Sequence, residues 1–253
     1  MLNIVIPMAG AGSRFARAGY KVPKPLILIN NIPMIRLVIE NLRPKTEHRF
    51  IFICQQSHIH AYNLEDKLSK WTPNCEIIGL DGLTEGAAST VLSAEKFIDN
   101  SSPLMIANSD QYIDANINDY LLYLNTRNLD GLIMTMKSVD PKWSFIGVRK
   151  DKTVSHVVEK EVISDEATVG IYNFSHGKDF VMAAKKMITK NLRVNGEFYV
   201  APVYNQLIEM NSKIGFYNID NKSTGMHGLG TPEDLELFLS NNNVCSQATN
   251  FVS

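Results

Sequence analysis

A glycine-rich segment directly follows the first apolar run of the chain and has the features of a phosphate-binding loop. The run 4–6 (Ile-Val-Ile) is followed by Ala9, Gly10, Ala11, Gly12 and Ser13, and then by Arg14. Glycines at such a position let the backbone approach a ligand, and free N–H groups there attract phosphate. Lys24 follows between two prolines, so that a guanidinium and an ammonium flank the loop. This pattern suits several phosphates of one nucleotide.

Two familiar phosphate loops do not match this segment. A dinucleotide fingerprint needs a third glycine where Phe15 stands, and an acid after the second strand, where the chain reads Cys54-Gln55-Gln56. The Walker A pattern G-x-x-x-x-G-K-[ST] is absent from the chain. The alternative interpretation of this segment is a strand-to-helix turn without a ligand, in which the basic side chains are solvated.

A single carboxylate is the candidate metal ligand. Asp110 follows the apolar run 104–107, which places it at the carboxyl edge of a strand, where ligands of α/β proteins collect. One carboxylate together with phosphate oxygens and water is a usual arrangement around Mg²⁺. The alternative interpretation of Asn108-Ser109-Asp110 is a simple turn.

Short apolar runs and helical patterns alternate along the first half of the chain and would position these residues. Each run is too short for a buried helix, which indicates core strands of a mostly parallel sheet. The runs are 4–6, 50–54, 77–80, 104–107 and 132–136, and helical patterns cover 34–42, 86–97 and 117–124. We therefore expect repeated βαβ units in a three-layer, Rossmann-like α/β fold with a mostly parallel mixed sheet.

The second half has a different pattern. The segments 145–148 and 154–158 flank a polar tip and predict a hairpin, and further strands are expected at 168–174 and 214–219. Helices are expected around 180–188 and 200–210, and a helix capped by Thr231 should begin at Pro232. We expect the polar tail from Ser240 to be frayed. One domain over 1–253 is predicted, with a nucleotide-binding half of about 1–137 and an acceptor-binding half of about 138–240.

Composition excludes several classes of protein. The 253 residues include 25 basic and 26 acidic ones, so no global charge favours nucleic acid or an acidic membrane. Cys54, Cys75 and Cys245 are widely spaced, which excludes a disulfide framework and disfavours a zinc cluster. Because no signal-like or membrane-spanning run is present, we expect a cytoplasmic protein without membrane insertion.

The ordered set Gly10, Gly12, Arg14 and Lys24 after the first strand resembles the signature of the sugar-nucleotidyltransferase superfamily, and the resemblance extends over nearly the whole chain. It implies that Arg14 and Lys24 are catalytic and grip the triphosphate, and that Asp110 holds Mg²⁺. The implied nucleotide-binding residues are Ala9, Gly10, Gly12, Ser13, Arg14, Lys24, Glu85, Gly86, Ala87, Ser89 and Asn108. The implied acceptor-binding residues are Glu159, Lys160, Gly170 and Glu197, and Gly228–Glu233 is similar to the family's late G-T-P-E segment.

The chain departs from the family at one position. The family commonly has a second metal-binding Asp just ahead of the late G-T-P segment, but residues 226–230 contain no acid. Phosphates, water and a displaced residue such as Asp220 are the remaining candidates, because His227 is a less attractive ligand for hard Mg²⁺.

The segments 159–170 and 195–199 are similar to a compact, capsule-associated branch of the superfamily. This resemblance implies transfer from a nucleoside triphosphate, CTP, to a phosphorylated small-molecule acceptor, phosphoglutamine, in capsular polysaccharide modification. The alternatives are a hexose-1-phosphate or phosphocholine nucleotidyltransferase, a glycosyltransferase with a similar sheet, and a nucleotide sensor without catalysis. The sequence leaves the oligomeric state open.

Overall fold

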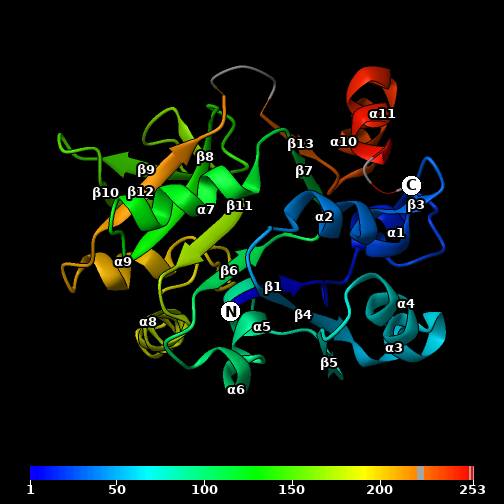
Figure 1. The fold of residues 1–253 in the computed structure, drawn as a ribbon, viewed down its shortest axis with the longest axis horizontal. Helices are drawn as coiled ribbons and strands as arrows, with labels where there is room; N and C mark the ends of the chain where they lie inside the picture. Colours follow the sequence, from blue (N-terminus) through cyan, green and yellow to red (C-terminus); the bar gives the residue numbers. More distant parts are fainter. Residues whose placement is uncertain (221–224, 251, 253) are drawn as a thin grey trace.

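A computed structural model describes residues 1–220, 225–250 and 252. Its centre is one nine-stranded sheet, in which β10, β9, β11, β6, β1, β4 and β5 lie side by side, while β8 pairs with β11 and β12 (Figure 1). The strands are β1 (Leu2–Pro7), β4 (His48–Gln55), β5 (Glu76–Leu80), β6 (Leu104–Ala107), β8 (Gly131–Lys137), β9 (Ser144–Val148), β10 (Val154–Glu159), β11 (Glu166–Phe174) and β12 (Ile214–Asn218). The expected mostly parallel mixed sheet is confirmed. Within this nine-stranded sheet, the antiparallel pairs are formed by β9, β10 and β11 with each other and with β6 and β8.

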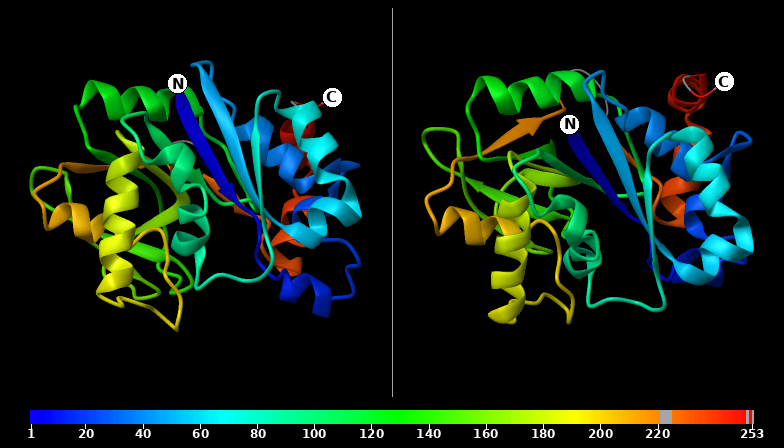
Figure 2. Two further views of the ribbon diagram at one scale, coloured as in Figure 1. Left: turned by 90° about the horizontal axis from the view of Figure 1, so that it is seen from below. Right: turned by 60° about the horizontal axis from the view of Figure 1, so that its bottom comes forward.

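Helices cover both faces of this sheet (Figure 2). One face packs against α2, α3, α4 and α7, and the other against α5, α6, α8 and α9. The helices are α1 (Ser13–Arg17), α2 (Met34–Leu42), α3 (Gln56–Tyr62), α4 (Leu64–Trp71), α5 (Ala87–Leu92), α6 (Glu95–Ile98), α7 (Ile117–Thr126), α8 (Gly177–Thr189), α9 (Val203–Ile208), α10 (Pro232–Ser240) and α11 (Asn242–Asn250). Shorter pieces are a 3-10 turn at Lys24–Leu26 and the strands β2 (Leu28–Ile29), β3 (Ile32–Pro33), β7 (Gln111–Ile113) and β13 (Met226–Gly228).

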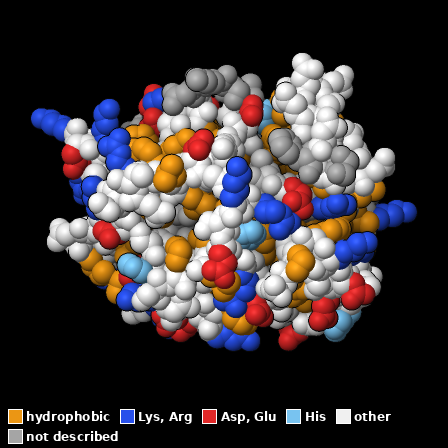
Figure 3. Space-filling model, in the orientation of Figure 1, with side chains coloured by type: hydrophobic (Ala, Val, Ile, Leu, Met, Phe, Trp, Pro, Cys, Tyr) orange, Lys and Arg blue, Asp and Glu red, His pale blue; other side chains and the backbone are white. Residues whose placement is uncertain are grey.

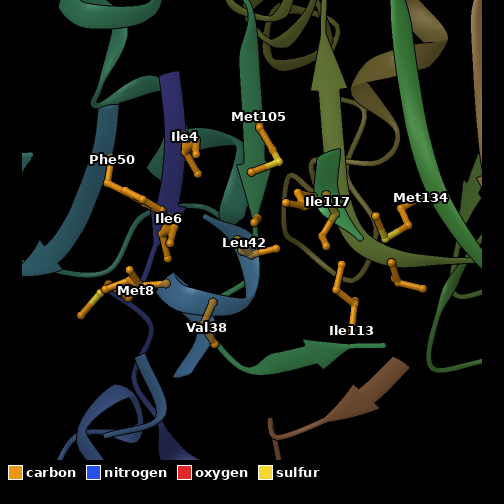
Figure 4. Packing of buried hydrophobic residues seen from close by; sticks show 14 of the residues in the cluster. Ile4, Ile6, Met8, Val38, Leu42, Phe50, Met105, Ile113, Ile117 and Met134 are labelled. Carbon is orange, nitrogen blue, oxygen red and sulfur yellow. The ribbon is translucent and has the colours of Figure 1, made fainter. Parts of the chain in front are cut away.

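The alternation of side chains along the central strands explains the two helical layers. Ile4 and Ile6 of β1 join the core on the α2 face, whereas Val5 between them joins the core on the α5 face. Side chains from β1, β4 and β6 point toward Val38 and Leu42 of α2 (Figure 4). Because successive side chains of a strand point to opposite faces, an apolar run without polar interruptions requires cover on both sides.

Two expectations about helices are wrong. The pattern over 86–97 is divided into α5 and α6 by a turn at Ser93 and Ala94. The tail from Ser240, expected to be frayed, is helical over Asn242–Asn250, where α11 buries Cys245 and Ala248 against a third apolar cluster formed with α2 and α10. These two small residues lie three apart on one face of α11, and such a sparse stripe gives little hydrophobic signal in a polar segment.

The surface carries no charge segregation on the face seen in Figure 3, where Lys and Arg side chains are interspersed with Asp and Glu. Within the described ranges, no helix has the length and apolar character that a membrane crossing requires.

Candidate active site

Two adjoining cavities open at the carboxyl end of β1. We call the smaller one, of about 280 Å³, the α3 cavity, because His58 and Tyr62 of α3 line it. The larger one, of about 470 Å³, is the α5 cavity, and Ala87 and Thr90 of α5 line it. We call residues 9–12 the glycine loop, and most of it lines both cavities. The residues common to the two linings are Pro7, Gly10, Ala11, Gly12, Lys24 and Ser109.

The glycine loop is held in place from both of its ends. Gly12 has a φ of 60°, a left-handed conformation that glycine adopts readily, and its carbonyl accepts the first hydrogen bond of α1 from Ala16. Gln55, at the end of β4, donates its side-chain amide to the Ala9 carbonyl at 3.0 Å. Gln55 occupies the place at the end of the second parallel strand where a dinucleotide-binding protein would have an acid. Here it positions the glycine loop instead.

Lys24 and Asp110 meet across the shared wall of the two cavities. Lys24 lies on the 3-10 turn and Asp110 lies in the bend after β6, yet Lys24 Nζ is 2.8 Å from Asp110 Oδ2. Both side chains are about one-quarter exposed, at 25% and 23%. The pair is open to a ligand from the α5 cavity, where both residues contribute to the lining.

The late glycine segment packs directly against Asp110. The Leu229 N–H donates to the Asp110 carbonyl at 2.8 Å. A β-carbon at Gly230 would lie only 2.5 Å from Asp110 Oδ2, so a side chain there would displace the carboxylate. Thr231 then caps α10 by accepting the Asp234 N–H at 3.1 Å, as expected from the sequence. The segment 228–231 therefore holds Asp110, the candidate metal ligand, in place through backbone contacts.

The loop before α5 is joined to a segment from the acceptor-binding half. The Phe198 N–H donates to the Glu85 carbonyl at 2.8 Å, and the Ala88 N–H donates to the Phe198 carbonyl at 2.9 Å. Gly86 has a φ of 126° between these two bonds, and a β-carbon there would come within 2.5 Å of the Phe198 backbone. We call this pair of hydrogen bonds the Phe198 junction.

Arg193 is a charged residue of the site that sequence reasoning missed. Its guanidinium donates to Glu85 Oε1 at 2.8 Å and lies 4.1 Å above the centre of the Phe198 ring. Glu85 therefore points at Arg193, with 62% of its side chain exposed, rather than into the α5 cavity. Arg193 lies just ahead of the segment 195–199 noted in the sequence, but that pattern does not include it, and its contact with Glu85 follows from the fold.

Glu159 ends β10 and Lys160 follows it, and the two residues differ in environment. Glu159 is buried, accepts a hydrogen bond from Ser144, and its pKa is raised by burial and, in smaller part, by the nearby Glu197 carboxylate. Lys160 donates to the Tyr199 hydroxyl at 2.5 Å and lies above the same ring. Two carboxylates and one ammonium thus gather on the acceptor side.

Gly170 lies at an irregularity of β11, where the pairing with β8 shifts between Thr168 and Tyr172. Its φ is 78°, and a β-carbon would come 2.2 Å from the Asn108 side-chain amide. Gly170 also accepts the Asn108 N–H at 3.0 Å. Such bulges re-aim a strand locally, and here the bulge brings β11 against the end of β6.

The α5 cavity brings together most of the residues proposed from the sequence. Its lining includes Ala9, Gly10, Gly12, Ser13, Lys24, Gly86, Ala87, Asn108, Asp110 and Glu197. Arg14 is exposed at the start of α1 and, among the described lining residues, belongs to neither cavity. Glu85, Glu159, Lys160 and Gly170 lie around this cavity rather than in its lining. The Ser89 hydroxyl is buried and has no hydrogen-bond partner among the described residues.

The donor set fits a Mg²⁺ that is shared with a substrate. Within the described residues, no group of three His, Cys, Asp or Glu side chains could hold a metal ion. Asp220 accepts the Lys137 N–H at the end of β8, and His227 lines other cavities. Asp110 and Glu197 are the acidic residues in the described lining of the α5 cavity, and Asp110 is the one that lies beside Lys24. Mg²⁺ is commonly bound by one or two carboxylates with substrate phosphates and water, so Asp110 is the candidate ligand.

The chain is similar in sequence to known nucleotidyl transferases. The family described as nucleotidyl transferase matches residues 4–200. The catalytic subunit beta of a mannose-1-phosphate guanylyltransferase from Danio rerio is 24% identical over 69% of this chain and 50% of its own length. The bifunctional protein GlmU from Methanococcus maripaludis is 25% identical over 69% of this chain and 40% of its own. The chain therefore spans half or less of the length of these two relatives.

Solved structures show the same fold. A nucleoside-diphosphate-sugar pyrophosphorylase from Vibrio cholerae RC9 has a TM-score of 0.79 and 25% identity, and the match covers 94% of this chain and 100% of that one. An inositol-1-phosphate CTP transferase from T. maritima has a TM-score of 0.73 and 13% identity, with coverage of 98% and 95%. Both matches extend over nearly all of this chain.

Proposed function

Because the chain belongs to the nucleotidyl transferase family, we propose that it transfers a nucleoside monophosphate from a nucleoside triphosphate to a small phosphorylated acceptor and releases pyrophosphate. The observation that carries this proposal is the Lys24–Asp110 pair at 2.8 Å. It lies in a cavity bounded by the glycine loop on one side and by Glu197 on the other. This arrangement supports a site that receives a triphosphate and a second anionic substrate together.

The transfer needs no nucleophile from the protein. An oxygen of the acceptor phosphate attacks the α-phosphorus, a new P–O bond forms, and the bond from the α-phosphorus to the bridging oxygen breaks. Pyrophosphate leaves with that electron pair, and a dianionic acceptor phosphate has no proton to lose. The tasks left to the protein are to bring two anions together and to offset the charge on the transferred group.

Each task falls to particular residues of this chain. The backbone N–H groups of the glycine loop and the Lys24 ammonium bind the triphosphate, and Arg14 adds a second cation from α1. Asp110 would hold a Mg²⁺ ion shared with phosphate oxygens, and such an ion supplies positive charge to the phosphoryl group and leaving group. Lys160 would bind the acceptor phosphate from the opposite side.

The pair of carboxylates on the acceptor side favours an acceptor with an ammonium group. Glu159 is buried and electrostatically coupled to Glu197, and no ion pair of Glu197 is found among the described residues. Lys160 offsets only one of these two carboxylates, so a phosphorylated acceptor binds more favourably here if it carries a positive charge of its own. This supports phosphoglutamine as acceptor and, by the resemblance to the capsule-associated branch, CTP as nucleotide.

Other acceptors remain as outcomes of the same experiment. Hexose 1-phosphates would place hydroxyl groups on Glu159 and Glu197, and phosphocholine would place a quaternary ammonium there. A glycosyltransferase would release a nucleoside diphosphate instead of pyrophosphate. A nucleotide sensor would release neither.

The decisive experiment crosses CTP, UTP, GTP, ATP and dTTP with phosphoglutamine, phosphocholine and hexose 1-phosphates, in the presence of Mg²⁺, and measures pyrophosphate. We expect release with CTP and phosphoglutamine. Absence of pyrophosphate with every pair would overturn the proposed function. Release with another pair would keep the transferase activity and correct the substrates.

Variants of the central ion pair test the proposed site. We expect Lys24→Ala and Asp110→Asn each to lower kcat/KM by about 10²- to 10⁴-fold, because charges in a partly desolvated site act on the transferred phosphoryl group. Lys178→Ala is the matched control, since Lys178 is exposed on α8, and it should keep normal turnover. Near-normal rates in Lys24→Ala and Asp110→Asn would overturn the assignment of these two residues to the active site.

A further inference from the structure

Two asparagines on different helices each make the same pair of hydrogen bonds with a strand. Asn41 of α2 donates its side-chain amide to the Ile113 carbonyl at 2.9 Å and accepts the Ile113 N–H at 2.9 Å. Asn205 of α9 donates to the Val157 carbonyl and accepts the Val157 N–H, both at 2.8 Å. A carboxamide has a donor and an acceptor, so it can bind both backbone groups of one strand residue. We call these two pairs of hydrogen bonds the α2 clamp and the α9 clamp.

Each clamp binds a strand that has a neighbouring strand on one side only. Among the described strands, β10 stands at the end of the sheet order and β7 pairs with β13 alone. The outer edge of such a strand leaves backbone groups unpaired unless another part of the chain covers it. The helix α2 lies against β7 and α9 lies against β10 (Figure 1). The clamps therefore fasten these two strand edges to helices.

The α2 clamp joins the two segments that carry the Lys24–Asp110 pair. Ile113 belongs to β7, three residues after Asp110. At the other end of α2, the Met34 N–H donates to the Ile27 carbonyl at 2.9 Å, and the Ile27 N–H donates to the Lys24 carbonyl at 3.1 Å. One helix of nine residues thus holds both segments. Its rise of about 1.5 Å per residue fixes their separation.

The α9 clamp joins two segments of the acceptor side. Val157 lies two residues before Glu159, the last residue of β10. The helix α9 begins at Val203, shortly after Glu197 and the Phe198 junction. The clamp therefore ties the strand that ends at Glu159 to the segment that brings Glu197 to the α5 cavity.

We propose that Asn41 and Asn205 are positioning residues of the active site. The α2 clamp sets the geometry of the Lys24–Asp110 pair, and the α9 clamp sets the place of Glu159. The roles of these three charged residues rest on the proposed function. Neither asparagine is among the described lining residues of the α3 and α5 cavities, so each acts through the strand that it holds. A displacement of about 1 Å can change a rate by about 10²-fold, and the clamps oppose such a displacement.

Backbone hydrogen exchange of the full chain, followed by mass spectrometry, tests the clamps without any substrate. We expect Asn41→Ala to speed exchange over residues 111–114 by about ten-fold, as for the loss of hydrogen bonds to the backbone, and to leave residues 155–159 unchanged. Asn205→Ala should do the reverse. Unchanged exchange in both segments would overturn the proposal, whatever the turnover.

The two alanine variants are matched controls for each other, because each loses the same two hydrogen bonds between a helix and a strand edge. Circular dichroism establishes that each variant is folded under the conditions of the assay. Asn41→Asp and Asn205→Asp keep the side-chain volume and the acceptor but lose the donor. They take the place of the alanine variants if these do not fold, and the expected segments are the same.

Kinetics with the substrate pair that releases pyrophosphate separate positioning from a general loss of stability. Asn41→Ala should raise the Mg²⁺ concentration for half-maximal rate by about ten-fold and leave the KM of the acceptor unchanged. Asn205→Ala should raise the KM of the acceptor by about ten-fold and leave the Mg²⁺ requirement unchanged. The same change of both constants in both variants would overturn the proposal. Selective hydrogen exchange without turnover for any substrate pair would support the clamps and overturn the proposed function.

Discussion

At the scale of single residues, the charges around the α5 cavity act in two different ways. Lys24 and Asp110 neutralise each other at 2.8 Å and stay accessible, so a substrate can exchange partners with them. Glu159 is buried, and its closest hydrogen bond comes from the neutral hydroxyl of Ser144. A carboxylate of this kind costs stability when it is ionised.

The pH dependence of stability should report on Glu159. Burial raises the pKa of Glu159 above its ordinary value of 4.5, so between that value and the raised pKa the folded chain binds more protons than the unfolded chain. The stabilising contribution of Glu159 is therefore fully present below pH 4.5 and is lost as pH rises through the raised pKa. We expect Glu159→Gln to remove this part of the pH dependence of the free energy of unfolding, measured by urea denaturation between pH 4 and pH 7.

Glu161→Gln is the control for this measurement. Glu161 is exposed and lies two positions from Glu159, so its substitution changes the net charge equally without changing a buried group. Identical pH profiles for the unmodified chain and Glu159→Gln would show that burial of this carboxyl has no energetic consequence.

The residues of the site were not equally predictable. Local motifs indicated Lys24 and Asp110 separately, Lys24 by its place between two prolines after the glycine loop and Asp110 by its place after an apolar strand. The fold then brings these two residues together although they are 86 positions apart. Arg193 and His58 carry no local signal of this kind. Arg193 joins the site through the Phe198 junction, and His58 joins it because α3 follows the strand next to β1.

At the scale of elements, the Phe198 junction depends on one glycine. Gly86 adopts a φ of 126°, and its neighbours within 3.0 Å of an added β-carbon are backbone atoms of Phe198, which cannot move like the end of a flexible side chain. The helical pattern of 86–97 gave no sign of this contact, because the contact is made to a segment more than a hundred residues away.

Gly86→Ala should therefore destabilise the chain strongly. We expect a loss of about 3 kcal/mol in the free energy of unfolding, from backbone strain together with the displaced junction. Pyrophosphate release by the folded fraction should fall as well, since Ala87 and Glu197 line the same cavity from either side of the junction. Urea denaturation and the release assay measure the two effects.

Gly82→Ala provides the comparison, because nothing lies within 4 Å of a β-carbon at Gly82. Its free energy of unfolding should stay within about 0.5 kcal/mol of the unmodified chain. Equal free energies of unfolding for Gly86→Ala and Gly82→Ala would mean that the Phe198 junction can shift without an energetic cost.

Strand patterns predicted the sheet better than helical patterns predicted the helices. Runs such as 50–54 and 104–107 lie in strands of the sheet. An uninterrupted apolar run is stable as a strand when both of its faces are buried, as they are in this sheet. The short pair β7 and β13 was missed, since three residues on each side are too few for a period to appear. The α11 helix was missed because tertiary packing, rather than composition, stabilises it.

At the scale of the whole molecule, one sheet and a shared apolar cluster on its α2 face connect the two predicted halves. Ile4 and Phe52 from the first half share a core with Ala167 and Val169 from the second. Trp71 and Trp143, one in each half, are the two tryptophans of the chain and pack against that same core. The halves therefore have no independent interior.

We expect the chain to unfold as one cooperative unit, as a single domain over 1–253 requires. The variants Trp71→Phe and Trp143→Phe each leave one tryptophan, which reports on one half by fluorescence. After correction for the stability of each variant, followed by circular dichroism, the fluorescence and dichroism midpoints in urea should coincide. Separate midpoints for the two halves would divide the chain into two domains.

The Phe198 junction has a consequence for redesign of this chain. The segment 84–88 and the segment 193–198 hold each other through backbone atoms, so neither can be replaced as a module without its counterpart. Replacing segment 84–88 by that of a relative would also shift Glu197, which lines the same cavity. Laboratory evolution that starts from this protein should therefore recover paired changes on both segments, and libraries confined to one of them should yield few active clones.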